Sequence, residues 1–299
     1  MDGLLIIDKP EGLTSHDVVA RVRRILKTKR VGHTGTLDPF ATGVLVLLIG
    51  KATRLAQFLD KDEKEYEAVI QFGFETDTGD RTGQRTAESE LQNEAISERL
   101  QTTDWKKVFD DFRGDIEQTP PMYSAKKQGG KKLYELARQG KEVERQPVSV
   151  LIKELELSEG FEIPNLKSQV RIRVVCSAGT YIRTLAEDIG RSIGIGAHLT
   201  ELRRTRAGKF ALGDSLSLDE LDPTSVTLLP IEKAVSHLPE FILSPDRVEK
   251  TRNGMTTRTS GAQYDDNVIV RMVDQNGDLV AIGVNENEVS EIRPKIVLA

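Results

Sequence analysis

The sequence of 299 residues predicts a protein of mixed helices and strands, arranged as one large unit followed by a small β unit. This length is sufficient for a large core and a satellite domain. Through most of the chain, amphipathic helical patterns alternate with strand patterns. The last sixty or so residues contain short strand patterns, with Asn276 and Gly277 as a hairpin turn.

The predicted elements follow from local patterns. Residues 14–26 predict an amphipathic helix, because Thr14 or Ser15 can cap its start and apolar residues follow at helical intervals. Residues 44–49 are all apolar and predict a buried strand. A first strand that runs into a turn is expected within residues 1–10. Further strands are expected over residues 66–74, 148–157, 170–176, 268–272, 278–284 and 292–298, and helical patterns over 90–114, 131–139 and 180–189. The composition of residues 76–83 is typical of an exposed loop, and that of 236–245 of a connector.

Basic residues are concentrated in three short segments, although the net charge of the chain is −5. The segments are residues 21–30, 126–132 and 203–209, whereas acidic residues concentrate in residues 60–117. One such segment alone is typical of a solvated helix face. Three of them, each beside a glycine-rich or polar motif, favour a nucleic-acid phosphate backbone as the partner.

Composition excludes several other classes of protein. Cys176 is the only cysteine, which excludes an intrachain disulfide and a cysteine-rich zinc site, and we expect a buried structural thiol. No apolar run is long enough to span a bilayer. The amino terminus lacks the basic region and long apolar stretch of a secretory signal. We therefore expect a cytoplasmic protein without a membrane segment.

The most distinctive motif is GHTGTLDPFATGVL in residues 32–45, which surrounds one carboxylate, Asp38, with glycines, threonines and a proline. An Asp-Pro step is a common turn, and its aspartate usually caps only its own backbone. Here His33, Thr34 and Thr36 crowd polar groups around the carboxylate without the spacing of metal ligands. The motif therefore favours a functional role for Asp38 and predicts no metal site.

Three other features give weaker signals. Tyr66 follows a highly charged stretch. Tyr181 and Arg183 lie at the start of a predicted helix, where one packed ring and one exposed guanidinium is the ordinary interpretation. Residues 119–140 begin with two consecutive prolines, which block a helix, and continue through a glycine pair into a short helix. This segment, called the arm below, is predicted to be mobile and basic on one side.

Seven motifs together resemble the TruB family, the tRNA pseudouridine-55 synthases of bacteria. They are DKPEGLTS in residues 8–15, the motif of residues 32–45, KEYEA around Tyr66, TPPMYSAKK in the arm, GTYIRTLAEDIG, ELRRT around Leu202, and EIRPKIVL near the end. They follow the family's order over nearly the whole chain. The resemblance implies an α+β pseudouridine synthase fold, with a curved, largely antiparallel mixed sheet flanked by helices. It also implies a catalytic domain in residues 1–238 and a small β-rich, PUA-like RNA-binding domain in residues 239–299.

The resemblance implies that the protein isomerises uridine 55 in the T loop of tRNA to pseudouridine. The family breaks the bond between N1 and C1′, turns the base and rejoins it through C5, a redox-neutral reaction for which no cofactor is expected. Asp38 matches the catalytic carboxylate, which can act as nucleophile or base, and which atom it attacks stays open. Arg183 matches the arginine that pairs with the carboxylate. Tyr66 matches the tyrosine that stacks on the target base and assists proton removal at C5.

Other matched residues concern substrate binding. Tyr181 and Leu202 match residues of the pocket, and His33 matches the residue inserted where the flipped nucleotide was. Lys9 belongs to the first motif and is assigned to substrate binding, although support of the active-site loop suits its turn better. The arm matches an insertion that closes on the T arm of the tRNA. Its lysines suited to phosphates are Lys126, Lys127, Lys131 and Lys132. The terminal domain is expected to contact the acceptor stem, and the protein to act as a monomer.

Two alternative functions stay open. A guide-RNA-dependent pseudouridine synthase of the archaeal and eukaryotic type shares the catalytic motifs, but the arm and the tail favour the bacterial type. A non-catalytic chaperone that unfolds and refolds tRNA is the second alternative. Every matched active-site position is intact, so the sequence gives no reason to expect loss of catalysis.

Overall fold

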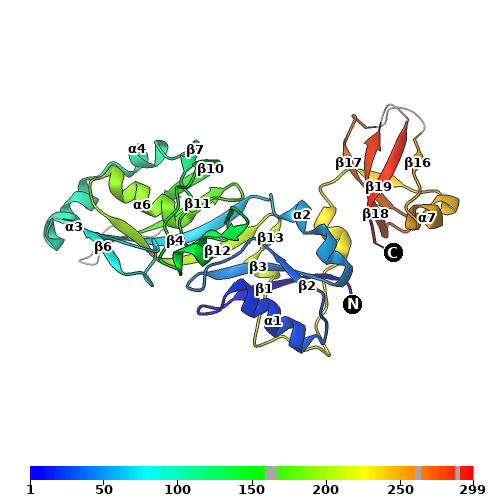
Figure 1. Cartoon of the computed structure of the whole chain (residues 1–299), viewed down its shortest axis with the longest axis horizontal. Helices are drawn as coiled ribbons and strands as arrows, with labels where there is room; N and C mark the ends of the chain where they lie inside the picture. Colours follow the sequence, from blue (N-terminus) through cyan, green and yellow to red (C-terminus); the bar gives the residue numbers. More distant parts are fainter. Residues whose placement is uncertain (90, 159–167, 260–263, 287–289, 299) are drawn as a thin grey trace.

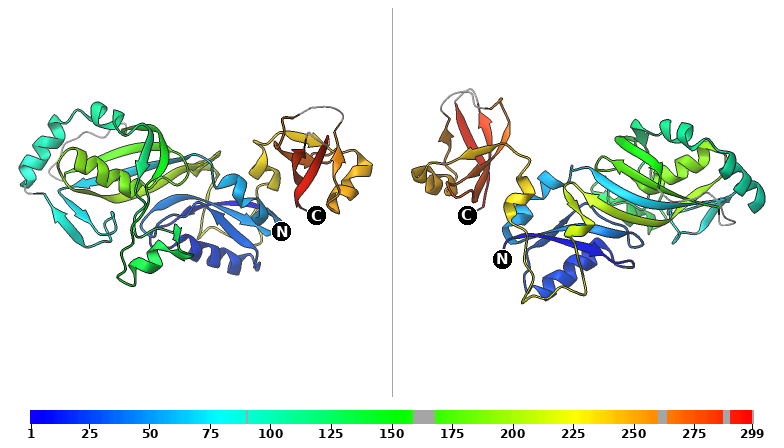
Figure 2. Two further views of the ribbon diagram at one scale, coloured as in Figure 1. Left: turned by 45° about the horizontal axis from the view of Figure 1, so that its top comes forward. Right: turned by 180° about the vertical axis from the view of Figure 1, so that it is seen from behind.

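The computed structural model describes residues 1–89, 91–158, 168–259, 264–286 and 290–298. The molecule is elongated, with a small β-rich module at one end of a larger unit, as Figures 1 and 2 show from three directions. A ten-stranded mixed sheet forms the larger unit, and a five-stranded sheet forms the module. The predicted α+β fold is confirmed.

Along the larger unit, helices separate groups of one to three strands. Its strands are β1 (Gly3–Lys9), β2 (Val31–Thr34), β3 (Thr42–Ile49), β4 (Lys64–Phe72), β5 (Phe74–Thr76), β6 (Arg85–Glu88), β7 (Gly114–Gln118), β8 (Lys127–Gln128), β9 (Lys131–Lys132), β10 (Val148–Leu157), β11 (Gln169–Cys176), β12 (Ala197–Ala207), β13 (Phe210–Ala211) and β14 (Leu216–Ser217). Its helices are α1 (Ser15–Ile25), α2 (Ala56–Leu59), α3 (Asn93–Thr102), α4 (Trp105–Asp110), α5 (Leu133–Ala137) and α6 (Ile182–Ser192). The module contains β15 (Glu240–Ile242), α7 (Pro245–Arg252), β16 (Thr257–Arg258), β17 (Ile269–Val273), β18 (Leu279–Glu286) and β19 (Glu291–Val297).

The large sheet consists of two mainly antiparallel halves joined by a parallel pair, and β14 at one edge adds a second parallel pair with β1. The main strand order is β14-β1-β3-β12-β4-β11-β10-β7, with β2 on β3 and β13 on β12. Strands β3 and β12 pair in parallel, with Gly43 opposite Arg204. Gly43 has a φ of +101°, and a Cβ there would lie 2.2 Å from the carbonyl oxygen of Arg204. Only glycine therefore fits at the junction of the two halves.

The apolar run of residues 44–49 forms β3, which is buried on both faces. On one face Leu45 and Leu47 pack against β1 and α1. On the other face Val44 and Val46 join a cluster that reaches residues of the module such as Leu279. Strands covered on both sides have continuous apolar sequences, which explains why this run does not alternate.

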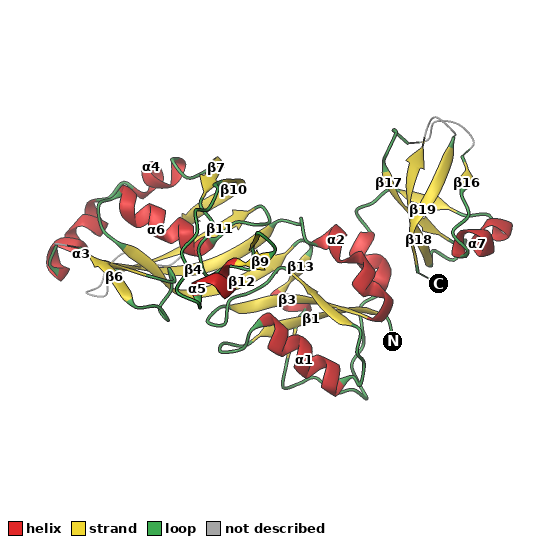
Figure 3. Cartoon of the chain, viewed as in Figure 1, coloured by secondary structure: helices red, strands yellow, loops and turns green. Residues whose placement is uncertain are grey.

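Helices α3, α4 and α6 cover one face of the β4–β11–β10 half, as Figure 3 shows. Ile182, Leu185 and Ile189 of α6 pack there against Ile70 and neighbouring strand residues. The opposite face of these strands is charged; Arg173, for example, forms ion pairs with Glu65, Glu154 and Glu156. The alternation of apolar and charged residues in β10 and β11 follows from this one-sided cover.

Several boundaries differ from the prediction. Residues 131–132 form β9 instead of the first turn of a helix, so that α5 is shorter than expected. The predicted connector of residues 236–245 contains β15, which pairs with β17. Residues 76–83 were predicted to be exposed, but Thr76 and Asp80 are buried because the loop packs against α6 and β12.

None of the helices in the described part of the chain has the length and apolar character needed to cross a bilayer.

Candidate active site

A cavity of about 280 Å³ brings together segments that are far apart in the sequence. Such a volume is near the lower end for small-molecule pockets, which is about 300 Å³. Its walls come from the loop before β3, from β4, from the arm, from the start of α6 and from β12. The sequence-predicted residues that line it are Asp38, Tyr66, Tyr181, Arg183 and Leu202. Lys64, Ser124 and Arg204 line it as well.

The loop that carries Asp38 is held from both sides. The hydroxyl of Ser15 accepts a hydrogen bond from the Leu37 amide at 2.9 Å, and the amide of Gly12 donates to the Pro39 carbonyl at 2.8 Å. Asp38 itself closes a turn, since its carbonyl accepts from the Ala41 amide. The backbone around the carboxylate is thus fixed by the first motif of the chain.

Asp38 and Arg183 form an ion pair at the cavity wall. The Nε atom of Arg183 lies 2.9 Å from Oδ2 of Asp38, and its Nη2 lies 3.3 Å from Oδ1. The arginine side chain is only 4% exposed, whereas the carboxylate is 34% exposed and can meet a ligand. This two-point contact fixes the orientation of the carboxylate.

The other donors of Arg183 bind backbone carbonyls. Its Nη1 donates to the Thr78 carbonyl at 2.6 Å, and its Nη2 donates to the Tyr123 carbonyl at 2.7 Å. Asp80 lies 3.9 Å from Nη1 and is itself held by hydrogen bonds from Thr82 and Thr78. Arg183 is therefore positioned by the loop of residues 76–83 and by the arm, as well as by Asp38.

Burial raises the pKa of the Asp38 carboxyl above its usual range, Arg183 opposes this shift, and Asp80 adds to it. Burial likewise raises the pKa of the Tyr66 hydroxyl, and Arg204 opposes that shift. The pKa of Tyr181 is raised mainly by burial. Arg183 is thus the main group that favours an ionised Asp38.

Arg204 is a charged residue of the site that the sequence analysis counted only as part of the basic segment of residues 203–209. It is almost completely buried, and it donates to the carbonyls of Val44 and Gly35 at 2.7 and 2.9 Å. It joins β12 to the loop before Asp38 and lies beside Tyr66. Its place in the ELRRT motif was visible in the sequence, but its burial was not.

His33 lies on β2 and stacks edge-on against His16 of α1, with ring centroids 5.3 Å apart. Its Nδ1 atom is buried and has no hydrogen-bond partner in the structure as described. Burial lowers the pKa of His33 to about 4, with smaller contributions from His16 and Arg204. The ring is therefore neutral at physiological pH. It does not line the cavity wall itself.

The burial of Lys9 contradicts the sequence-based assignment of this residue to substrate binding. Its side chain is completely buried, and its ammonium donates to the carbonyls of Pro10, Leu13 and Pro39 at 2.9, 2.7 and 3.3 Å. Lys9 therefore holds the turn next to Asp38 and does not present its charge to a ligand.

The arm lies beside the cavity and contributes Ser124 and Ala125 to its wall. Its cationic residues lie outside that wall. Lys126, Lys127 and Lys131 are exposed and Lys132 is partly exposed.

The third basic segment does not form a free cationic surface. Arg203 pairs with Asp8, Arg204 is buried, and Arg206 pairs with Glu63. Lys209 donates to the hydroxyl of Ser236. Acidic residues thus neutralise Arg203 and Arg206, and Arg204 is buried, so the cationic surface of residues 203–209 is smaller than the composition indicates.

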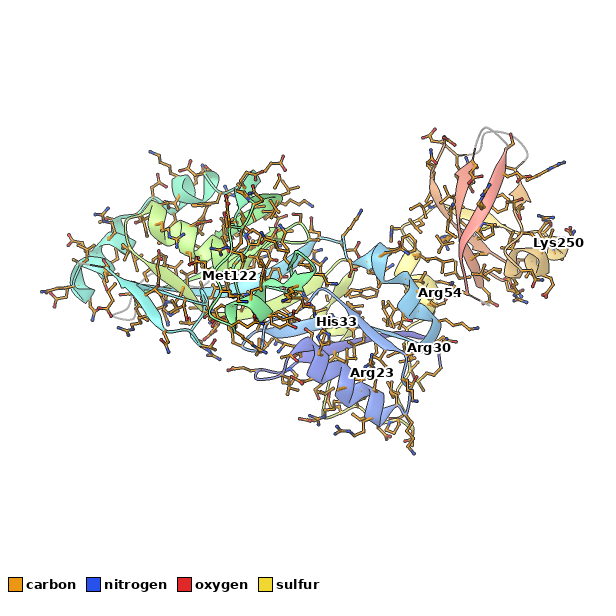
Figure 4. All side chains as sticks on the ribbon, viewed as in Figure 1. Arg23, Arg30, His33, Arg54, Met122 and Lys250 are labelled. Carbon is orange, nitrogen blue, oxygen red and sulfur yellow. The ribbon has the colours of Figure 1, made fainter. Side chains whose placement is uncertain are left out.

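The first basic segment keeps most of its charges available. Arg21 pairs with Asp219, and Arg23 donates to the Val31 carbonyl. The remaining exposed cations are Arg24, Lys27, Lys29 and Arg30. Figure 4 labels Arg23 on α1, Arg30 just before β2 and His33 on β2.

The described residues contain no cluster of three or more histidine, cysteine, aspartate or glutamate side chains that could hold a metal ion. Cys176 is buried, and burial raises the pKa of its thiol to about 11.

Two family descriptions match the chain. Residues 23–182 match the N-terminal domain of the TruB family of pseudouridylate synthases, and residues 183–243 match the C-terminal domain of tRNA pseudouridylate synthase B. The first match contains Asp38 and Tyr66, and the second begins at Arg183. The two matches therefore meet at the cavity described above.

Curated relatives cover most of the chain. A protein of Geobacillus thermodenitrificans is 46% identical over 86% of each chain, and one of Solibacter usitatus is 44% identical over 95% of each chain. A protein of Bacillus subtilis is 42% identical over 87% of this chain and 84% of its own. All three carry the name tRNA pseudouridine synthase B.

Solved structures with the same fold are less similar in sequence. The structure of an H/ACA ribonucleoprotein bound to a substrate RNA containing 2′-deoxyuridine superposes with a TM-score of 0.71 at 27% identity. The crystal structure of a Cbf5-Nop10-Gar1 complex gives the same TM-score at 28% identity. Each match covers 99% of this chain and 85% of the other chain.

Proposed function

Because the chain belongs to the TruB family of pseudouridylate synthases, we propose that it isomerises uridine 55 in the T loop of tRNA to pseudouridine. The observation that carries this proposal is the ion pair of Asp38 with the buried Arg183 in a cavity that also contains Tyr66 and Tyr181. A carboxylate that is oriented and partly exposed can act on a sugar or a base within the cavity.

A uridine in a folded T loop must leave its stack to reach Asp38, at a cost of about a few kcal/mol. We assign the role of filling the vacated space to His33. Its ring is neutral and braced by His16, and a neutral aromatic ring can stack on bases without desolvating a charge. Tyr66 and Leu202 supply the aromatic and apolar walls for the flipped base.

In the chemical step, we assign to Asp38 the attack on the target nucleotide. This attack either causes the cleavage of the bond between N1 and C1′ or follows it. Arg183 keeps the carboxylate ionised and oriented. Tyr66 stacks on the base and assists removal of the proton from C5 after the base has been rejoined through that carbon. The pKa of Tyr66 is raised by burial, so the hydroxyl is neutral before the reaction. It therefore assists by accepting the C5 proton while passing its own proton to water.

We propose that the phosphates of the rest of the tRNA bind the exposed cations on either side of the cavity. Lys126, Lys127, Lys131 and Lys132 of the arm would hold phosphates on one side of the cavity. Arg24, Lys27, Lys29 and Arg30 would hold the stem on the other side, because Arg30 directly precedes the strand that carries His33.

We propose that residues 239–299 form a PUA-like RNA-binding domain that contacts the acceptor stem, and that residues 1–238 form the catalytic domain. Hydrogen bonds between these two domains support a fixed distance between the cavity and the RNA-binding domain. Arg54 donates to the Val297 carbonyl of β19, and the Leu279 amide donates to Glu232 at 3.2 Å. We further propose that the protein acts as a cytoplasmic monomer.

The guide-RNA-dependent alternative rests on the fold shared with the Cbf5 complexes. Identity to those chains is 27–28%, whereas identity to the proteins named tRNA pseudouridine synthase B reaches 46%. The sequence relationship therefore favours action on tRNA without a guide.

A guide-free reaction tests the proposal. An unmodified T-arm hairpin is incubated with the protein alone, and pseudouridine is mapped chemically at each position. We expect one modified position, uridine 55. Product that forms only after a guide RNA is added would support the alternative, and binding without any product would support a chaperone.

A further inference from the structure

The arm is connected to the active site through Gln118, the last residue of β7. Its side chain is only 1% exposed. The amide of Tyr181 donates to Oε1 of Gln118 at 3.0 Å, and Nε2 of Gln118 donates to the carbonyl of Tyr181 at 3.3 Å. One buried amide group thus satisfies both backbone groups of a residue that lines the cavity.

Tyr181 is the N-cap residue of α6, directly before Ile182. No side chain of its own caps the helix, and its carbonyl also accepts the first helical hydrogen bond, from Leu185 at 3.0 Å. Arg183 lies in the first turn of the same helix. A shift of the Tyr181 backbone would therefore move Arg183, and with it the partner of Asp38.

A second contact joins the arm to the same arginine. Nη2 of Arg183 donates to the carbonyl of Tyr123 at 2.7 Å and lies 3.3 Å from Oδ1 of Asp38. One nitrogen therefore bonds both the backbone of the arm and the candidate catalytic carboxylate. Tyr123 is five residues after Gln118, so both contacts belong to the base of the arm.

The segment between the two contacts is stiff. Pro120 and Pro121 fix two φ angles and remove two amide donors. Nη1 of Arg145, which follows the arm, donates to the Pro120 carbonyl at 3.1 Å. Figure 4 labels Met122 within this segment. A displacement of the arm is therefore transmitted to α6 instead of being absorbed locally.

We propose that Gln118 is a positioning residue that couples the seating of the arm to the placement of Tyr181 and Arg183 in the active site. This inference rests on the proposed function, because RNA held by the arm lysines would set the position of the arm. Gln118 does not line the cavity. It acts through the backbone of Tyr181.

The test compares Gln118→Ala with Gln71→Ala. Gln71 is the control, because its side-chain amide likewise bonds two backbone groups, with Nε2 donating to the carbonyls of Phe72 and Ser168, and it does not line the cavity. Three quantities are measured for each variant: the single-turnover rate of pseudouridine formation on tRNA, the Kd for tRNA, and the hydrogen exchange of the Tyr181 amide without RNA. The thermal unfolding midpoint shows whether the two variants lose similar stability.

We expect Gln118→Ala to lower the single-turnover rate by about 10- to 100-fold, because small displacements of reacting groups have effects of this size. Its Kd for tRNA should stay within about threefold of wild type, since no phosphate contact is lost. The Tyr181 amide should exchange faster in this variant only. Gln71→Ala should keep the wild-type rate.

An unchanged rate in Gln118→Ala, or an equal loss of rate in Gln71→Ala, would overturn the inference. Unchanged protection of the Tyr181 amide would overturn it as well. If the wild-type protein makes no pseudouridine, the proposed function fails, but the exchange measurement still decides whether Gln118 holds Tyr181.

Discussion

The backbone of Arg204 occupies the space where a side chain of Gly43 would lie. A Cβ on Gly43 would be 2.2 Å from the Arg204 carbonyl oxygen and 2.8 Å from its amide nitrogen. The two residues face each other in the parallel pair that joins the halves of the large sheet. The motif that contains Asp38 is thus attached directly to the strand that carries Arg204 and Leu202.

Gly43→Ala should lower the free energy of unfolding by more than about 3 kcal/mol, because both the clash and the positive φ are unfavourable. Gly12→Ala is the matched control. Gly12 also has a positive φ, of +85°, but nothing lies within 4 Å of a Cβ there. It should cost only about 1–2 kcal/mol. Urea unfolding of both variants measures the difference, and equal losses would show that the close approach of Arg204 has no energetic effect.

Arg183→Lys should shift the acid limb of the pH–rate profile to higher pH. Activity requires ionised Asp38, burial raises its pKa, and Arg183 opposes that shift. A lysine keeps the charge but loses the two-point contact, so the pKa of Asp38 should rise further. Single-turnover rates across the acid range measure this. An acid limb that stays in place would mean that Arg183 does not control the protonation of Asp38.

His33 should make the protein less stable in mild acid. Its pKa is about 4 in the folded state and near 6.5 when unfolded, so the unfolded chain binds more protons between these values. The contribution of His33 to stability is therefore present above about pH 6.5 and decreases as the pH falls toward 4. His33→Phe should remove this part of the pH dependence in urea unfolding at pH 7 and pH 5. If the free energy of unfolding depends on pH in the same way in wild type and variant, His33 does not have a lowered pKa in the folded state.

Replacing Lys126, Lys127, Lys131 and Lys132 together with alanine should weaken tRNA binding and flatten its salt dependence. Each lost phosphate contact should lower the slope of log Kd against log salt by about 0.7–0.9. The double variant Lys106→Ala and Lys107→Ala is the control, because these lysines are exposed on α4 and do not line the cavity. It should keep the wild-type slope. A wild-type slope in the arm variant would show that the arm does not hold phosphates.

The parts of the site that could be predicted from the sequence are those encoded by local motifs. The glycines, the threonines and the Asp-Pro step predict the loop around Asp38. The apolar run of residues 44–49 predicts the buried strand β3. Thr14 caps α1 as expected, with a hydrogen bond from the Asp17 amide at 3.1 Å.

The parts that could not be predicted depend on contacts between distant segments. The loop of residues 76–83 has a polar composition, yet it is packed against α6 because Thr78 binds Arg183 across 105 residues. The basic residues 203–209 have the same composition as a phosphate-binding surface, but Asp8 and Glu63 neutralise two of them. Composition cannot reveal such pairings, since it does not say which strands become neighbours.

The central claim is that the Asp38 carboxylate carries out the reaction, and Asp38→Asn tests it most directly. The variant keeps the size of the side chain and removes its charge. In single-turnover reactions with unmodified tRNA, we expect no detectable pseudouridine, a Kd within about threefold of wild type, and full activity in the control Asp110→Asn, an exposed residue of α4. Pseudouridine formation by Asp38→Asn at a rate near that of wild type would contradict the account.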